Sequence, residues 1–382
     1  MIRKTILSIF IFMLAALFTG CGRENSDQSS AAQNYESGYG SAKMEDDTGS
    51  VMEQEIMDGT DTETIVLSSE VMQLENGLSA VEYRGDDGFD EFISQGGASS
   101  DEEVVAFLAG ELFSGEKEIS FGGMPFGCST LSVKDGQGNW LFGRNFDWDS
   151  CNGMIVSSLP ENGYASISTV NTDFIRMSGL KLSDLPDAVQ AMICLYASLD
   201  GMNEKGLAVS VNMIQDTATI SQNTDKPDIT TTTAIRLLLN QAADVGEAVE
   251  LLKQYDMHAS MGYMMHLALA DRNGCSVVVE YINNEMVVTD TPVVTNFYLA
   301  EGEKNGGGTS QSHERYDILM QALADGNAMS MEDVGKALDS VSKGNFGEFE
   351  STEWSIVFNQ GTGEVHYYHR ENYGKNYIFR IG

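Results

Sequence analysis

Basic residues are scarce in this chain. Its 382 residues include 22 Lys and Arg against 57 Asp and Glu, which gives a formal net charge of −35 at pH 7. Such a charge repels nucleic acid phosphates and anionic membrane surfaces. We therefore expect no nucleic acid partner, and we interpret the acidity as a solubility feature of a secreted protein.

Cysteine and histidine are also few. The five cysteines include no Cys-X-X-Cys spacing, so nothing supports a zinc site, and the five histidines lie outside any cysteine-protease motif, which argues against a papain-like enzyme. We predict neither a metal nor a cofactor. Cys194 and Cys275 stand beside apolar residues and are interpreted as small core residues. The sequence leaves open a disulfide between two of Cys151, Cys194 and Cys275.

An apolar run near the N-terminus is too short to span a membrane. Arg3 and Lys4 precede apolar residues 5–18, fewer than the roughly 20 that a bilayer requires, and Cys21 follows where a lipoprotein signal ends. We expect residues 1–20 to be a signal peptide and Cys21 to carry a lipid. The protein would then lie outside the cytoplasm, anchored to the bacterial cell membrane through that lipid.

Apolar residues are rare in the segment after this cysteine. Residues 21–64 are rich in Ser, Asn, Gln, Gly, Asp and Glu, a composition that cannot bury enough surface to fold, so we expect a disordered tether. Within residues 65–127, an alternating pattern predicts a strand at residues 78–83 and apolar spacing predicts a helix over residues 101–113. We therefore expect residues 65–127 to fold, unlike the tether before them.

A predicted β-hairpin opens the remaining residues, 128–382, which suffice for one large domain. Its turn is Asp-Gly-Gln-Gly-Asn at residues 135–139, between apolar stretches. The second strand would bring Arg144 and Asp147 back beside Cys128. A thiol, a guanidinium and a carboxylate would thus converge at one end of the hairpin, which is more than packing requires.

Strands and helices follow one another along the rest of the chain. Strands are expected at residues 165–170, 207–211, 265–270, 276–281, 354–358, 364–368 and 377–381, and helices over residues 232–255 (broken near 244–246), 313–324 and 331–341. Hairpin connections between many of these strands predict an α+β layered fold with antiparallel sheets.

Four motifs stand in a characteristic order. They are Cys-Ser-Thr at 128–130 with Gly-Arg-Asn-Phe-Asp-Trp at 143–148, Gly-Met-Asn-Glu-Lys-Gly-Leu at 201–207 running to Asn212, Val-Thr-Asn at 294–296, and Ser-His-Glu-Arg-Tyr at 312–316. In this order they resemble the choloylglycine hydrolase and N-acylethanolamine amidase/acid ceramidase group of N-terminal nucleophile hydrolases. The resemblance implies the four-layer αββα sandwich of those enzymes and the hydrolysis of a linear carbon–nitrogen amide bond.

The resemblance implies that the chain releases its own nucleophile. Residues 65–127 would then be a pro-segment or a small N-terminal subunit, and residues 128–382 the catalytic N-terminal nucleophile hydrolase domain. Cys128 would attack the carbonyl of Gly127 and cut the Gly127–Cys128 bond, and its freed α-amino group would then act as the base for its own thiol. Arg144 would favour the thiolate through its positive charge, and Asp147 would orient the α-amino group. The alternative is that Arg144 and Asp147 form an ordinary surface salt bridge.

Three further residues follow from the same motifs. Asn212 and Asn296 match the positions whose amides stabilise the tetrahedral intermediates, and Arg315 matches a second arginine near the nucleophile. Asn203 is the alternative to Asn212, although its surroundings in the sequence favour a turn between strands. For Asn145, the alternative to a functional role is a turn cap.

The implied function is the hydrolysis of a linear amide outside the cytoplasm. The partner would be a small-molecule amide with an apolar acyl group: an N-acyl amine, an N-acyl amino acid or a conjugated bile acid. Two alternatives stay open, namely an acyltransferase of the isopenicillin N type, which passes the acyl group to an amine, and a lipid-anchored binding protein that never matures. The sequence also leaves open whether the chain forms a homo-oligomer.

Overall fold

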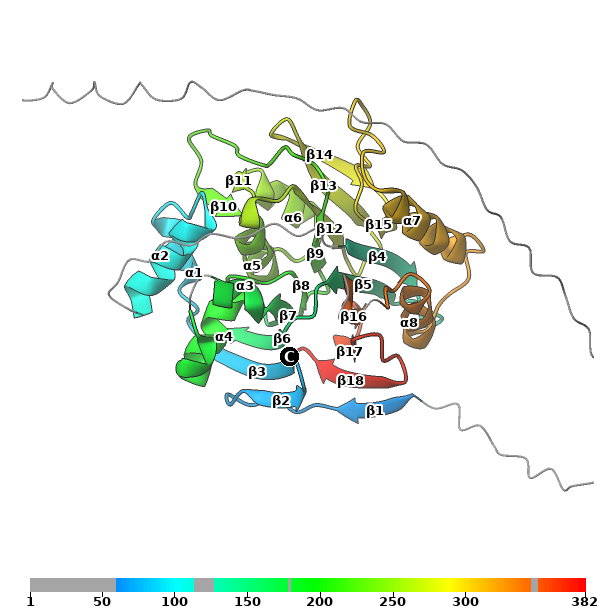
Figure 1. The fold of residues 1–382 in the computed structure, drawn as a ribbon, viewed down its shortest axis with the longest axis horizontal. Helices are drawn as coiled ribbons and strands as arrows, with labels where there is room; N and C mark the ends of the chain where they lie inside the picture. Colours follow the sequence, from blue (N-terminus) through cyan, green and yellow to red (C-terminus); the bar gives the residue numbers. More distant parts are fainter. Residues whose placement is uncertain (1–59, 113–126, 178–179, 345–349) are drawn as a thin grey trace, which may run out of the picture. The chain divides into compact units, whose positions relative to one another are not determined.

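The computed structural model describes residues 60–112, 127–177, 180–344 and 350–382 (Figure 1). The expected signal peptide, Cys21 and most of the expected tether lie outside these residues, and so does the segment 113–126. In the described part of the chain, no helix is both long enough and apolar enough to cross a bilayer.

Two large sheets form the centre of the fold. The seven-stranded sheet consists, in spatial order, of β1 (Asp61–Thr64), β18 (Lys375–Arg380), β17 (Glu364–His369), β16 (Ser351–Asn359), β5 (Trp140–Trp148), β4 (Gly127–Lys134) and β15 (Val293–Val294). The nine-stranded sheet consists of β14 (Glu285–Asp290), β13 (Ser276–Ile282), β12 (Met265–Ala270), β9 (Ala208–Met213), β8 (Asp200–Asn203), β7 (Ser166–Asn171), β6 (Gly153–Pro160), β3 (Leu78–Gly85) and β2 (Met72–Glu75). Most neighbouring strands are antiparallel, as predicted.

Helices cover the outer face of each sheet. α4 (Asp187–Leu195) and α5 (Thr231–Gln241) pack on the nine-stranded sheet, α5 mainly against β8 and β9. On the seven-stranded sheet, α7 (Ser310–Leu323) packs against β4 and β15, and α8 (Met331–Asp339) packs against β5 and β16. Helices, two sheets and helices thus form four layers, and the expected αββα sandwich is confirmed (Figure 1).

Smaller elements complete the described chain. They are α1 (Phe89–Ser94), α2 (Asp101–Leu112), α3 (Thr172–Met177), α6 (Val245–Leu252), the 3₁₀ helices η1 (Leu182–Asp184) and η2 (Ser260–Gly262), and the parallel pair β10 (Asp228–Thr230) and β11 (Asp256–His258). The predicted break between two helices is confirmed, because Asp244 caps α6 by accepting the backbone N–H of Glu247 at 2.9 Å. The other predicted strands and helices are also present, with ends that differ by a few residues.

The predicted β-hairpin is confirmed as β4 and β5. The two strands are antiparallel, with Cys128 opposite Phe146 and Thr130 opposite Arg144. Asp135 closes the turn, since its carboxylate accepts the N–H groups two and four positions later. Side chains of opposite residues share a face of the sheet, so Cys128 and Arg144 lie on the same face.

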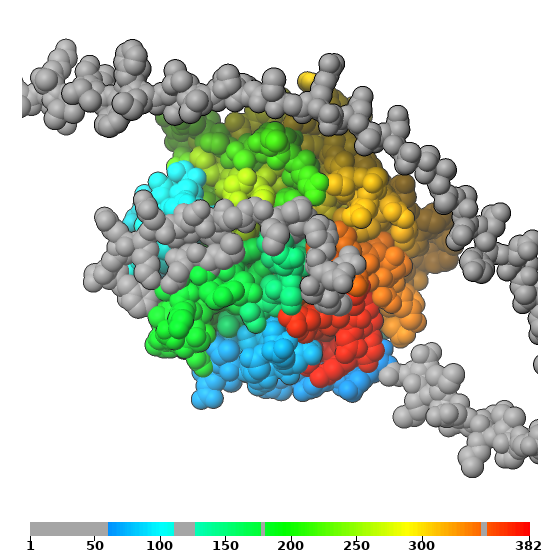
Figure 2. All heavy atoms as spheres, viewed as in Figure 1, coloured from blue at the N-terminus to red at the C-terminus, as the bar shows by residue number. Residues whose placement is uncertain are grey.

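The segment before the hairpin contributes strands to both large sheets. β3 pairs in parallel with β6 over eight residues, from Leu78 opposite Gly153 to Gly85 opposite Pro160, and β1 pairs in parallel with β18. Figure 2 shows the consequence on the surface, where the blue N-terminal residues lie against the red C-terminal ones. Residues 60–112 therefore belong to the same packed body as the hairpin.

The prediction of a tether is wrong for residues 61–64, which form β1. All four side chains are exposed, and the strand is held by backbone pairing with β18, from Asp61 opposite Lys375 to Thr64 opposite Ile378. Such an edge strand needs no apolar side chains. Its composition therefore does not distinguish it from a disordered segment.

The four cysteines of the described residues are free thiols. Cys151 and Cys194 are buried, and the interpretation of Cys194 as a core residue is confirmed. The same interpretation is wrong for Cys275, which is exposed. Cys275 ends the turn before β13, where its N–H donates to Asp271 Oδ1 at 3.2 Å. The apolar residues that follow it in the sequence are buried in β13, but Cys275 itself lies outside the strand.

Candidate active site

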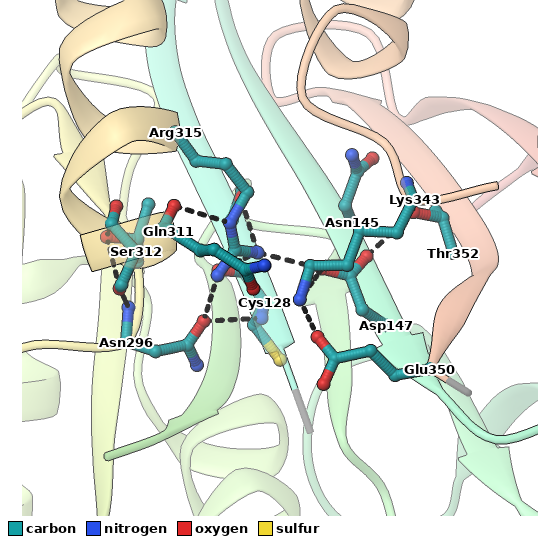
Figure 3. A network of polar contacts seen from close by, with 12 residues as sticks. Cys128, Asn145, Asp147, Asn296, Gln311, Ser312, Arg315, Lys343, Glu350 and Thr352 are labelled. Atoms are coloured by element: carbon teal, nitrogen blue, oxygen red, sulfur yellow. Dashed lines mark hydrogen bonds and ion pairs between the residues drawn. The ribbon is translucent and has the colours of Figure 1, made fainter. Parts of the chain in front are cut away.

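Cys128 lies at the start of β4 and is fully buried (Figure 3). Its backbone N–H donates to Asn296 Oδ1 at 2.7 Å, and its Sγ lies 3.8 Å from the carbonyl oxygen of Val211 on β9. Burial raises the pKa of this thiol above its ordinary value, although Arg144 and Arg315 act to lower it. In the intact chain, the expected support of the thiolate by Arg144 is therefore outweighed by burial.

Arg144 is fully buried on the same face of the hairpin. Its Nε donates to Asp200 Oδ2 at 2.6 Å, and its Nη1 donates to Asn212 Oδ1 at 2.9 Å and to the carbonyl oxygen of Val211 at 3.0 Å. The Val211 oxygen is also the one that faces Cys128, which puts the guanidinium beside the thiol. The buried Nη2 has no hydrogen-bond partner among the described residues, so one donor is available there.

Asp147 lies on the opposite face of the hairpin, across from Gly127. Its Oδ2 accepts a hydrogen bond from Arg315 Nη1 at 2.7 Å, and its Oδ1 accepts one from Thr352 Oγ1 at 2.7 Å. Lys343 Nζ lies 3.9 Å from the same Oδ2. Two cations and a hydroxyl therefore surround this fully buried carboxylate.

The alternative roles of the hairpin residues are wrong. Arg144 and Asp147 form no surface salt bridge, because both are fully buried on different faces and have different partners. Asn145 caps no turn, since it lies within β5. Its Nδ2 donates to the carbonyl oxygen of Leu338 at the end of α8 at 2.8 Å, and its Oδ1 accepts from Ser355 Oγ at 2.7 Å.

Arg315 connects the groups around the backbone of Cys128 (Figure 3). Its Nη1 donates to Asp147 at 2.7 Å, to Ser129 Oγ at 3.2 Å and to the Cys128 carbonyl oxygen at 3.3 Å. Its Nη2 donates to Asn296 Oδ1 at 2.8 Å. One guanidinium from α7 therefore joins the Asp147 carboxylate to the Asn296 amide, with Cys128 between them.

Asn296 presents its oxygen, and not its amide nitrogen, to Cys128. The Oδ1 atom accepts from the Cys128 N–H and from Arg315, whereas Nδ2 donates to the carbonyl oxygen of Met213 at 2.7 Å. The backbone N–H of Asn296 donates to Ser312 Oγ at 2.6 Å, at the start of α7. In the intact chain Asn296 Oδ1 thus binds the backbone N–H of Cys128. This contact differs from the implied role, in which the amide nitrogen of Asn296 would stabilise an oxyanion.

Asn212 lies in β9, directly beside the arginine of the hairpin. Its Oδ1 accepts from Arg144 Nη1 and from Ser210 Oγ, and its Nδ2 lies 3.5 Å from the carbonyl oxygen of Val294. The side chain of Asn203 instead closes the turn after β8, where its Oδ1 accepts the N–H groups two and four positions later. Of the two candidates, the structure brings Asn212 to Arg144 and keeps Asn203 in the turn.

Asp200 is a site residue that the motifs do not identify. It is fully buried at the start of β8, and its Oδ2 accepts from both Arg144 Nε and Trp354 Nε1, the latter at 3.0 Å. Burial raises the pKa of this carboxyl, and Arg144 acts against that effect. Its one signal in the sequence is its position directly before the Gly-Met-Asn motif.

His266 and Glu280 support the site from the nine-stranded sheet. Both side chains are fully buried, with His266 Nδ1 3.1 Å from Glu280 Oε1 and His266 Nε2 2.8 Å from the carbonyl oxygen of Thr295. Burial acts to raise the pKa of Glu280, but the hydrogen bonds from His266 and from the N–H groups of Leu299 and residue 300 bring it below its ordinary value. The pair thereby fixes the backbone next to Asn296.

Metal ligands are a separate question. No group of three or more His, Cys, Asp or Glu side chains that could hold a metal ion occurs in residues 60–112, 127–177, 180–344 and 350–382. The donors around Cys128 are amides, guanidinium groups and one carboxylate, a set suited to binding nitrogen and oxygen atoms of an organic substrate.

Comparison with known proteins agrees with this geometry. Residues 128–297 match the family of linear amide C-N hydrolases, choloylglycine hydrolase family. No curated protein matches the chain. Two structures of variants of a conjugated bile acid hydrolase from Clostridium perfringens are similar, with TM-scores of 0.51 and 0.52 and sequence identities of 19% and 17%. Each comparison covers 66% of this chain and 92% of the other, and shows the N-terminal nucleophile hydrolase fold.

Proposed function

We propose that this chain is a linear amide C–N hydrolase, in keeping with the match of residues 128–297 to the choloylglycine hydrolase family, and that it frees Cys128 as its nucleophile by cutting the Gly127–Cys128 bond. The surroundings of the Cys128 nitrogen carry this proposal. Asn296 Oδ1 lies 2.7 Å from that nitrogen, and Arg315 links Asn296 to Asp147. No hydrogen bond of Cys128 within the described residues involves a histidine, so a freed amine is the base that this site supports.

The cut would be an acyl shift followed by hydrolysis. Cys128 Sγ bonds to the carbonyl carbon of Gly127, the carbon–nitrogen bond breaks, and the thiol proton passes to the Cys128 nitrogen. Water then hydrolyses the thioester, which leaves a carboxylate on Gly127 and a free thiol and amino group on Cys128. All atoms are accounted for by the chain and one water molecule.

The mature site would use the same sulfur on an amide substrate. The α-amino group, with an ordinary pKa of about 7.7–8.0, takes the thiol proton and returns it to the leaving amine. The free Nη2 of Arg144 supports the thiolate, and Asn296 Oδ1 with Asp147 orients the amino group. Asn212 Nδ2, whose contact to Val294 is long, is the better placed amide for the oxyanion. Water finally hydrolyses the acyl-enzyme.

We place the reaction outside the cytoplasm, with the chain anchored to the bacterial cell membrane through a lipid on Cys21. The lipoprotein-type N-terminus supports this location. The substrate class we propose is a small-molecule amide with an apolar acyl group: an N-acyl amine, an N-acyl amino acid or a conjugated bile acid. The conjugated bile acid hydrolases of the same fold support the last of these.

Intact-mass analysis of the full-length protein tests the proposal. We expect a fragment that begins at Cys128 in the wild type and a single uncut chain in Cys128→Ala. A panel of fatty-acyl and bile-acid amides then measures hydrolysis, which should be lost in Cys128→Ala and strongly reduced in Cys128→Ser. Amide hydrolysis that survives removal of the thiol would refute the mechanism. An uncut wild-type chain that binds amides without hydrolysing them would favour the binding protein.

A further inference from the structure

Three charged groups converge on Gly127. A Cβ atom at this residue would lie 2.6 Å from Asp147 Oδ2, 2.9 Å from Lys343 Nζ and 3.0 Å from Glu350 Oε1. The first two distances are shorter than real Cβ contacts and the third is tight, so a side chain at this position would require Asp147 and Lys343 to shift. The space beside the proposed scissile bond is therefore filled by two acidic side chains and one basic side chain.

The position of Lys343 is fixed by its backbone. The Thr352 N–H donates to the Lys343 carbonyl oxygen at 2.9 Å, and the Lys343 N–H donates to Thr352 Oγ1 at 2.8 Å. The same Thr352 hydroxyl donates to Asp147. Lys343 Nζ also forms an ion pair with Glu350, and both side chains are largely buried. One threonine thus sets the lysine and the aspartate relative to each other (Figure 3).

Charge balance indicates what this lysine does. In the intact chain, two anions (Asp147 and Glu350) face two cations (Arg315 and Lys343) around Gly127. The proposed cut adds negative charge to Gly127, first on its carbonyl oxygen and then on its carboxylate. Without Lys343, two carboxylates and one guanidinium would face that developing charge, which is unfavourable in a buried site.

We infer that Lys343 is a maturation residue, whose ammonium group beside Gly127, oriented by Glu350 and Thr352, offsets the negative charge that the cut creates. The inference rests on the proposed self-cleavage and assigns to it a residue that none of the four sequence motifs contains. It also explains the glycine, because any larger residue at position 127 would displace the ammonium group from the bond that it serves.

The pH dependence of the cut follows from the surroundings of the lysine. Burial lowers the pKa of Lys343, Arg315 lowers it further, and Asp147 and Cys128 act to raise it, with the net result below the ordinary value. Lys343 therefore loses its charge at a lower pH than an exposed lysine. The cut should lose its assistance on the alkaline side, whereas an arginine at this position keeps its charge throughout.

The test measures the rate of the cut. Full-length wild type, Lys343→Met and Lys343→Arg are made by cell-free synthesis at mildly acidic pH and diluted into buffers from about pH 6 to about pH 10, and intact mass follows the fragment that starts at Cys128. We expect Lys343→Met to be cut about tenfold or more slowly. The ratio of the wild-type rate to the Lys343→Arg rate should fall as pH rises, because the wild-type chain loses the ammonium charge while the arginine keeps its charge.

The controls separate the possible outcomes. Lys336→Met removes an exposed lysine of α8 that pairs with Glu332 and should leave the rate of the cut unchanged. If the wild type is cut and Lys343→Met is cut equally fast, the inference is wrong while the proposed function stands. If Lys343→Met is misfolded by near-UV circular dichroism, a pH-independent ratio for Lys343→Arg overturns the inference. If the wild type hydrolyses amides uncut, self-cleavage itself is refuted.

Discussion

The two faces of the β4–β5 hairpin carry different chemistry. The inner face, toward β8 and β9, holds the thiol of Cys128 and the guanidinium of Arg144. The outer face, toward α7 and α8, holds Asp147 with Arg315 and Lys343. Successive side chains of a strand point to opposite faces of the sheet, so the Cys128 thiol and the Asp147 carboxylate lie on different faces. The backbone nitrogen of Cys128 lies where the two faces meet.

The two buried arginines of the site serve different faces of the hairpin. Arg144 is paired with Asp200 and faces the sulfur, whereas Arg315 is paired with Asp147 and faces the backbone. Neither can substitute for the other, since they lie on opposite sides of the sheet. Variants confined to one face should therefore affect different observables.

The largest effect is expected on the inner face, for Arg144→Met. We expect kcat/KM to fall about a hundredfold to a thousandfold, because the cation beside the sulfur is lost. The free energy of unfolding should fall by roughly 3–5 kcal/mol, because the buried carboxylate of Asp200 loses its cationic partner and keeps only neutral donors such as Trp354 Nε1. Denaturant unfolding and steady-state kinetics measure both quantities.

The double variant Arg144→Met with Asp200→Asn is the matched control. It should recover much of the stability, since no buried charge is left unpaired, but it should recover no activity. Recovery of activity together with stability would mean that Arg144 acts only as a structural residue.

A smaller effect is expected on the outer face, for Asp147→Asn. We expect kcat/KM of the mature enzyme to fall about tenfold to a hundredfold. A carboxylate raises the pKa of a nearby amine, so its removal should let the α-amino group lose its proton at a lower pH. The acidic limb of the profile of kcat/KM against pH should therefore move to lower pH. Asp317 is an exposed residue of α7, and Asp317→Asn should leave the limb in place. A shift of the limb to higher pH in Asp147→Asn would contradict the assignment.

A still smaller loss of activity is expected for His266→Gln, which acts on the site only through the backbone next to Asn296. Since His266 binds the carbonyl oxygen of Thr295, its loss should loosen Asn296, and we expect activity to fall by less than tenfold. The free energy of unfolding should fall by about 1–3 kcal/mol, because Glu280 loses a buried partner. Pairing the variant with Glu280→Gln should restore stability, and an activity loss as large as that of Asp147→Asn would show a more direct role.

The smallest effect is expected outside both faces, at Cys275. This exposed thiol should react with an alkylating reagent in the native protein, although partial burial and nearby carboxylates raise its pKa and slow the reaction, whereas buried Cys151 and Cys194 should react only after unfolding. Cys275→Ser should change neither the cut nor hydrolysis. Peptide mass mapping measures the labelling, and rapid labelling of Cys194 would show that the packing between the layers is looser than described.

Local spacing predicts the hairpin and brings Arg144 to the same strand pair as Cys128, whereas Asn212, Asn296 and Arg315 follow only from the order of motifs in the resemblance. The turn at Asp135 and the offsets from Cys128 to Arg144 and Asp147 lie within about twenty residues of sequence. The ion pair between Asp200 and Arg144 could not be predicted in this way, because 56 residues separate the two in the sequence and no local pattern links them. Only the order of strands in the two sheets brings them together.

Sequence patterns indicate neither the position of Lys343 at the site nor the edge strand β1, for related reasons. Lys343 belongs to no motif, and its place depends on backbone bonds to Thr352 in β16. β1 has only exposed polar side chains, so nothing in its composition signals pairing with β18. The exposed Cys275 shows the converse, where apolar neighbours suggest burial but a turn places the residue outside.

The pairing of β3 with β6 has a consequence for how the cut chain would stay attached to the proposed lipid anchor. Cys21 and β3 lie before residue 127, and the nucleophile lies after it, so the proposed cut would leave lipid and thiol on separate polypeptides. Eight residues of pairing between β3 and β6, together with β1 against β18, would then be the link between them. Membrane attachment of the catalytic fragment would depend on the folded state alone, and unfolding would release it.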